Sequence, residues 1–195
     1  DEEKEALKHI RKIEPVFYLP TGETIRSQQG NRRIYVYPSG YEDEDGTNRL
    51  LDFPARRIEV AIWADPKKPE EFFIPGSFGK TTDQQDELRL REAERLSKRP
   101  ELNGVTIIRP EASEVTEVMF QHFDATGVCL LGQDWVKDGY WRYVRTNTPT
   151  AKSGSYLASV GGFDADYGPS VFGWYRDRGF VYIGDAFWVV PNRSR

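Results

Sequence analysis

Residues 75–82, which read PGSFGKTT, have the side chains that commonly hold phosphate: glycines, a lysine and hydroxyls. The usual nucleotide loop follows the pattern Gly-x-x-x-x-Gly-Lys. Here the second glycine would be Gly79, but Ile74 stands where the first must be. The spacing therefore argues against a nucleotide loop. It leaves a looser anion site, formed by Lys80, Thr81 and the backbone amides at the start of a following helix.

A second pattern, in which aspartates alternate before a glycine, occurs at Asp164, Asp166 and Gly168. Such a pattern can open a calcium loop, but that loop also needs further oxygen ligands and a closing glutamate. The next carboxylate after Gly168 is Asp177, so we predict a turn in which aspartate oxygens accept hydrogen bonds from backbone amides. The sequence predicts no metal site.

Catalytic patterns are scarce in this chain. It has two histidines, His9 and His122, and no Gly-x-Ser-x-Gly nucleophile motif. It has 31 aspartates and glutamates, so the count alone leaves room for the acid and base pair of a glycosidase. We expect a protein without a cofactor. The sequence favours a non-catalytic role and leaves enzyme activity open.

Aromatic residues and arginines alternate over the last third of the chain. In an extended YWRYVR segment, Trp141, Tyr143 and Arg145 share one face, and alternate residues of FGWYR at 172–176 do the same. One face of such strands must enter the core, where at least half of the rings are expected. The other face can stack on sugar rings, bases or a protein partner. The predicted ligand-binding residues are Trp141, Tyr143, Trp174, Arg176, Arg178, Asp164 and Asp166.

The spacing of apolar residues predicts the elements that position these side chains. Helical periodicity predicts helices near 2–13, 83–98 and 113–123. Thr82 and Gln85 fit a capping box for the second helix. Short apolar runs predict strands, among them 57–64, 71–74 and 128–131. We predict a single α+β domain over residues 1–195, with a predominantly antiparallel β-sheet, about three peripheral helices and an aromatic-rich β half at 128–195.

Composition limits the range of partners and compartments. The chain has 195 residues, a net charge of −4 and a pI of about 5.4, which disfavours nonspecific binding to nucleic acid or anionic membrane. Cys129 is the only cysteine, so no disulfide forms within the chain. No apolar run in the sequence is long enough to span a bilayer. Because the sequence starts at Asp1 and its only methionine is Met119, we expect a soluble form, processed or truncated at its N-terminus, of unknown location.

The segments GSYLAS and FGWYRDRGFVYIGDAFWVVPNR, within residues 154–195, are similar to the ending of C-type-lectin-like domains of the bacterial and phage kind. Those domains close with a tryptophan strand, a glycine hairpin and a final strand that ends in a basic residue. The resemblance implies a fold that displays a ligand, and it assigns no role to any single residue.

These observations favour a non-catalytic binding or structural protein that presents an aromatic recognition face. We expect it to be a component of a larger assembly, such as a virion or an extracellular appendage, with a protein partner or a second copy of itself. The alternative is a carbohydrate-binding or carbohydrate-acting protein with an aromatic-lined cleft. A nucleotide-dependent protein fits the sequence least well, because the glycine spacing fails.

Overall fold

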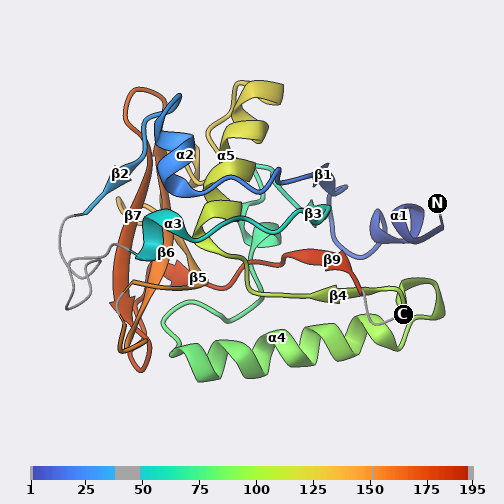
Figure 1. Cartoon of the computed structure of the whole chain (residues 1–195). Helices are drawn as coiled ribbons and strands as arrows, with labels where there is room; N and C mark the ends of the chain where they lie inside the picture. Colours follow the sequence, from blue (N-terminus) through green and yellow to red (C-terminus); the bar gives the residue numbers. More distant parts are fainter. Residues whose placement is uncertain (1, 38–48, 151, 193–195) are drawn as a thin grey trace.

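The computed structural model describes residues 2–37, 49–150 and 152–192, which form an α+β fold with two β-sheets (Figure 1). This agrees with the predicted fold class. The smaller sheet contains, in spatial order, β1 (Val16–Tyr18), β3 (Val60–Ile62), β9 (Val189–Pro191) and β4 (Val105–Ile107). The larger sheet contains β2 (Tyr35–Val36), β7 (Gly168–Tyr175), β6 (Tyr156–Asp164), β5 (Tyr143–Pro149) and β8 (Ile183–Gly184).

Antiparallel pairing dominates both sheets, as predicted. Among the described strands only the pairs β2–β7 and β5–β8 are parallel. The segment 57–64 was expected to be a strand, and its residues Val60–Ile62 form β3, an inner strand of the smaller sheet. β6 has the longest run of buried positions, because β5 and β7 flank it and its two faces are both covered.

The helix α5 (Ala112–Thr126) lies between the two sheets (Figure 1). The predicted inward residues Val115, Val118 and Met119 are fully buried, and they join one hydrophobic cluster with strands of both sheets. The helix ends at Gly127, whose φ of 72° gives the left-handed backbone that suits a glycine. The expectation that every helix is peripheral is therefore wrong for α5, which fills the centre of the fold.

The helix α4 (Thr82–Ser97) runs along the surface beside β4 (Figure 1), close to its predicted bounds. Its capping box is one residue earlier than predicted. The hydroxyl of Thr81 accepts a hydrogen bond from the amide of Gln84, and the Gln84 side chain accepts one from the amide of Thr81. Thr82 is buried instead, so the hydroxyl chosen from the sequence is not the cap.

The remaining helices are short. α1 (Glu2–Leu7) covers only the first half of the helix predicted at 2–13. After Leu7 the backbone turns tightly, and Arg11 lies with its guanidinium 3.8 Å from the ring centre of Phe187 and beside the buried carboxylate of Glu71. These contacts draw the segment away from a helical path. The sequence did not predict α2 (Ile25–Gln29) or α3 (Arg49–Asp52).

Two predicted strands are absent from the described structure. Around 71–74 a single 3-10 turn (Pro69–Phe72) is followed by one bridge between Phe73 and Ala186. At 128–131 the chain is irregular, since Leu131 has a φ of 56°, and a 3-10 turn (Gln133–Trp135) follows. Both segments are apolar because they are buried, and burial alone does not require a strand. A further 3-10 turn covers Pro100–Leu102.

Two hydrophobic clusters hold the elements together. The larger one joins α5 to both sheets, and the smaller one joins α1 and α4 to the smaller sheet through Leu7, Leu96 and Phe187. Three of the five tryptophans, Trp63, Trp135 and Trp188, are almost fully buried. Within the ranges that the structure describes, no helix combines the length and apolar character needed to cross a bilayer.

Candidate functional site

The outer face of the larger sheet carries a hollow of about 420 Å³, hereafter the aromatic hollow. All but one of its lining residues are aromatic. It is lined by Tyr37, Tyr140, Trp141, Tyr143, Phe172, Gly173, Trp174, Phe180 and Tyr182. Three of the predicted ligand-binding residues, Trp141, Tyr143 and Trp174, therefore lie together in one depression.

Strand register places the floor of this hollow on the side of the sheet away from α5. Val144, Val160 and Val171 are paired across β5, β6 and β7, and all three are fully buried in the central cluster. Their neighbours along the strands point the opposite way. Tyr143 and Phe172 accordingly meet on the outer face, with ring centres 4.8 Å apart at 81°. The predicted shared face is confirmed for Trp141 with Tyr143 and for Phe172 with Trp174, but Arg145 and Arg176, predicted on the same faces, do not line the hollow.

The segment between β7 and β8 folds back over this face and supplies a wall. Phe180 stacks on Trp174, with ring centres 4.6 Å apart and planes at 22°. Tyr182 stacks on Tyr140 at 4.4 Å and 21°. Offset stacking of this kind is worth about 0.5–1.5 kcal/mol per pair beyond the area that it buries. The wall is therefore pre-ordered against the sheet by ring contacts.

The polar atoms of the hollow are phenol hydroxyls and indole N–H groups. Burial, with a smaller contribution from Tyr37, raises the pKa of Tyr143 to about 12, so its hydroxyl stays protonated and able to donate. Burial also raises the pKa of Tyr182. The indole Nε1 of Trp174 is buried and has no hydrogen-bond partner among the described residues. The hollow thus offers ring faces and a few neutral donors, and no side chain of its lining is a carboxylate or an imidazole.

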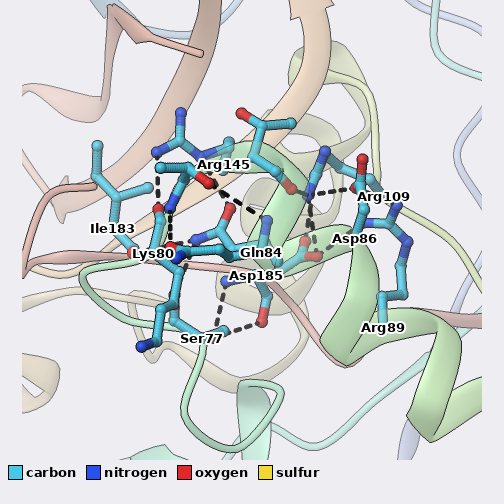
Figure 2. A network of polar contacts seen from close by, with 12 residues as sticks. Ser77, Lys80, Gln84, Asp86, Arg89, Arg109, Arg145, Ile183 and Asp185 are labelled. Atoms are coloured by element: carbon cyan, nitrogen blue, oxygen red, sulfur yellow. Dashed lines mark hydrogen bonds and ion pairs between the residues drawn. The ribbon is translucent and has the colours of Figure 1, made fainter. Parts of the chain in front are cut away.

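Arg145 lies on the same strand as Tyr143 but is fully buried, because the returning segment and the start of α4 cover it (Figure 2). Its guanidinium donates to the side-chain oxygen of Gln85 at 2.8 Å. It also donates to three backbone carbonyls, those of Tyr175 at 3.1 Å, Arg178 at 3.0 Å and Lys80 at 3.4 Å. One side chain thereby ties the beginning of the wall segment and the residue before the α4 cap to the sheet.

Among the described residues no carboxylate is hydrogen-bonded to Arg145, and its guanidinium donates to backbone carbonyls and a side-chain amide. Burial, together with the neighbouring Arg109, lowers the pKa of Arg145 to about 10, which leaves it charged at neutral pH. Further along, the buried carboxylate of Asp185 pairs with Arg89 at 2.7 Å and with Arg109 at 3.3 Å (Figure 2). Asp86 also binds Arg109, at 2.8 Å. This network fixes α4 against the residues that follow β8.

Arg176 and Arg178, also predicted to bind a ligand, are exposed and line a different, open hollow of about 710 Å³. The guanidinium of Arg178 lies over the ring of Tyr175, 4.2 Å from its centre. The rings of Tyr175 and Trp174, one from each hollow, are 5.8 Å apart, but the two hollows share no lining residue. The structure therefore leaves both arginines out of the lining of the aromatic hollow.

Asp164 and Asp166 lie in the turn between β6 and β7 and line neither hollow. A carboxylate oxygen of Asp164 accepts hydrogen bonds from the amides of Asp166 at 2.8 Å and Tyr167 at 3.1 Å. This is the capping turn expected from the sequence. The described part of the chain contains no group of three or more His, Cys, Asp or Glu side chains that could hold a metal ion.

The residues of the predicted anion site have other contacts. The hydroxyl of Thr81 caps α4, and the carbonyl of Lys80 accepts from Arg145. The Lys80 side chain is exposed. An anion site at this position stays a prediction.

Two lining residues, Tyr140 and Phe180, could not be predicted from local sequence patterns. Strand alternation predicts Tyr140 opposite Trp141, but β5 begins only at Tyr143. A tight turn closed by two hydrogen bonds between Lys137 and Tyr140, with φ of 52° at Asp138, brings the Tyr140 ring to the hollow. Phe180 reaches the hollow because the segment between β7 and β8 folds back over the sheet. Short-range spacing in the sequence does not predict how that segment folds.

Comparison with known proteins gives no relative: no family model matches the chain, and no curated protein or solved structure matches it significantly. The resemblance of residues 154–195 to the ending of C-type-lectin-like domains therefore has no counterpart among these comparisons. The functional conclusion rests on the geometry of the site.

Proposed function

We propose that this chain is a non-catalytic binding protein whose aromatic hollow docks an extended segment of a protein partner. The observation that carries the proposal is the gathering of eight aromatic side chains around one hollow of about 420 Å³. Aromatic-lined grooves bind extended and proline-rich peptides, because ring faces pack on the flat, preformed backbone of such segments. The exposed edge of Tyr140, which is 55% accessible, gives a partner a ring to cover.

The charges around the hollow indicate the chemistry of the partner segment. On one side a smaller hollow of about 160 Å³ shares Tyr182 and contains the side chains of Lys137 and Arg142, with Glu70 beside them. On the other side Arg176 and Arg178 are exposed. Complementary charge steers and registers a partner. A segment with proline or aromatic residues between acidic residues fits this arrangement best.

A glycan fits the same rings less well. Sugar-binding platforms usually have carboxylates or carboxamides that accept hydrogen bonds from several sugar hydroxyls, and the polar side chains of the described lining are phenols and indoles only. Asp164 and Asp166, which could have served as acceptors, lie at a distant turn. The expectation that the partner belongs to a virion or an extracellular appendage stays a prediction.

Selection of binding peptides from a random displayed library tests the proposal. We expect the selected peptides to be rich in proline or aromatic residues with acidic neighbours, and Tyr140→Ala to weaken their binding at least tenfold. Tyr167→Ala is the matched control, because Tyr167 is 69% exposed in the turn between β6 and β7 and does not line the hollow. It should leave binding within about twofold, as most surface truncations do.

Two results would overturn this function. One is that no peptide is selected, or that the selected peptides bind Tyr140→Ala and the native protein equally. The other is that a glycan array gives binding that Tyr140→Ala abolishes while the peptide selection fails, which would establish the carbohydrate-binding alternative. Folding of each variant is checked by near-ultraviolet circular dichroism, since the stacked rings give it a fixed aromatic signal.

A further inference from the structure

A second hollow, of about 270 Å³, lies between α2 and α5 on another part of the surface. The two helices lie side by side (Figure 1). The α5 residues that line it are spaced so that they share one face of the helix. The hollow, hereafter the α2–α5 cleft, is lined by Glu23, Ser27, Gln28, Asn31, Arg32, Glu117, Phe120, Gln121 and Asp124.

Glu117 is the only side chain of the cleft that is both buried and anionic, with 7% of its surface exposed. One carboxylate oxygen, Oε1, accepts hydrogen bonds from the amide and the hydroxyl of Thr21, the latter at 2.6 Å, and from Gln121 at 3.4 Å. The other oxygen, Oε2, is buried and has no partner in the described structure. None of the ion pairs found among the described residues involves Glu117. A buried carboxylate oxygen without a partner is costly unless something donates to it.

Gln28 presents a second acceptor of the same kind. It is 7% exposed, and its amide nitrogen donates to the carbonyl of Ser113 at 2.9 Å. This bond fixes the orientation of the amide, because a carbonyl accepts and cannot donate. The amide oxygen, Oε1, is buried and finds no donor among the described residues. Two of the residues that line this cleft therefore each have a buried side-chain oxygen without a donor.

Arg32, the one cationic side chain that lines the cleft, already has partners. Arg32 pairs with Asp124, and its guanidinium lies over the ring of Phe120, 5.2 Å from the centre. The lining then has three carboxylates, those of Glu23, Glu117 and Asp124, against this one guanidinium. The cleft consequently has an excess of negative charge, unpartnered acceptors and an aromatic ring at one side.

We propose that the α2–α5 cleft binds the ammonium group of a small primary amine. An ammonium is a point charge with three donors, so it can give one hydrogen bond to Glu117, one to Gln28 and one to water or to the rim. A short alkyl chain attached to it would pack beside Phe120. This binding is separate from the aromatic hollow and does not depend on the peptide partner.

A guanidinium fits the cleft less well than an ammonium. Its strong binding mode uses two parallel N–H donors on both oxygens of one carboxylate. In Glu117 the oxygen Oε1 is occupied by Thr21, which leaves one oxygen free. A metal ion fits less well still, since no metal-binding group of acidic or thiol or imidazole side chains exists among the described residues.

Titration of ¹⁵N-labelled protein with n-butylamine near neutral pH tests this site. We expect saturable amide shifts confined to α2 and α5, with a dissociation constant of millimolar order for so small a ligand. Butan-1-ol, which has the same chain without the charge, should give no saturable shift. Butylguanidine should bind several-fold more weakly than butylamine.

Two variants test whether the buried oxygens of Glu117 and Gln28 bind the ammonium group. Glu117→Gln keeps an oxygen for Thr21 and the same shape, and it should weaken butylamine binding at least tenfold. Gln28→Met removes the second acceptor and should weaken it several-fold. Glu87→Gln, which removes an exposed carboxylate of α4, is the charge-matched control and should change nothing.

The proposal is overturned if butylamine gives no saturable shifts, if butan-1-ol binds as well as butylamine, or if Glu117→Gln binds butylamine as tightly as the native protein does. In each case the two buried oxygens would have no part in binding an ammonium group. The same spectra report whether each variant is folded, so a loss of binding can be separated from a loss of structure.

Discussion

Replacement of Arg145 by methionine should loosen the wall of the aromatic hollow while the rest of the fold persists. The native guanidinium donates four hydrogen bonds, to Gln85 and to the carbonyls of Tyr175, Arg178 and Lys80. Methionine has nearly the same length and apolar volume but gives none of these donors. The variant therefore leaves the part-buried carbonyls of Arg178 and Lys80 without this donor, and the Tyr175 carbonyl keeps only the amide of Arg178, at 3.4 Å.

The magnitude follows from two opposed contributions. Four hydrogen bonds from a charged donor, at about 1.5 kcal/mol each, amount to about 6 kcal/mol. Burial of the native guanidinium costs several kcal/mol in lost hydration, and that cost disappears with the charge. We therefore expect the free energy of unfolding to fall by about 3 kcal/mol. Peptide affinity should fall as well, because Phe180 and Tyr182 lie on the segment that is released.

Urea denaturation, followed by tryptophan fluorescence and by far-ultraviolet circular dichroism, measures the loss. Hydrogen exchange should show faster exchange of amides 176–182 than in the native protein. Arg176→Met is the control, because Arg176 is an exposed arginine of the same segment and should cost within about 0.5 kcal/mol.

A loss below 1 kcal/mol for Arg145→Met, or unchanged exchange of the wall amides, would refute the reasoning. Either result would mean that ring stacking and the backbone hydrogen bonds of the segment, such as the one from the Tyr143 amide to the Tyr182 carbonyl at 2.9 Å, hold it without Arg145. The Arg145 side chain would then be a buried charge whose removal is nearly neutral, as occurs when apolar residues replace buried ion pairs.

Three further outcomes are expected. Gly161→Ala should lower the free energy of unfolding in urea by more than about 3 kcal/mol, since a Cβ there would overlap the Arg142 carbonyl and lie 2.7 Å from a backbone Cα. Gly76→Ala should lower it by only about 1 kcal/mol, because a Cβ there meets open space and only the φ of 74° is strained. Burial lowers the pKa of His122, so the unfolded chain takes up a proton first; the native protein should lose stability as pH falls below about 6.5, and His122→Gln should reduce that slope between pH 7 and 5.5. Tyr143 has its pKa raised to about 12, so its contribution to stability should be present below pH 10 and vanish as pH rises toward 12, and Tyr143→Phe should remove one late phenol from an ultraviolet titration. Equal losses of stability at the two glycines would contradict the first expectation. An unchanged dependence of stability on pH in His122→Gln would contradict the second, and an unchanged ultraviolet titration of Tyr143→Phe would contradict the third.

Short-range spacing predicted much of the site. Strand alternation placed Trp141 and Tyr143 on the same face, and the same rule applied to the strand that carries Trp174; all three line one hollow. Alternation works here because side chains of a strand point to opposite faces in turn, whatever the rest of the chain does. The aromatic composition of the segment also indicated correctly that some rings would remain at the surface.

What could not be predicted depends on contacts between distant segments. Strand alternation places Arg145 on the outer face of the sheet, but α4 and the wall segment cover it there. Trp188 belongs by composition to the aromatic set, yet it is buried because β9 joins the smaller sheet. The helix predicted at 2–13 ends at Leu7 because Arg11 packs on the ring of Phe187, which is far away in the sequence. The spacing of residues within a short stretch of sequence does not predict such contacts between distant segments.

The place of β9 in the smaller sheet has a consequence for the order of folding. β9 (Val189–Pro191) lies between β3 and β4, and it is hydrogen-bonded to both. During synthesis β3 and β4 therefore leave the ribosome long before the strand that joins them, and each exposes an unpaired edge in the interval. Pairings of such long sequence separation make folding slow and leave edges open to other chains. The nascent protein should need a chaperone, or a low local concentration, until β9 has left the ribosome.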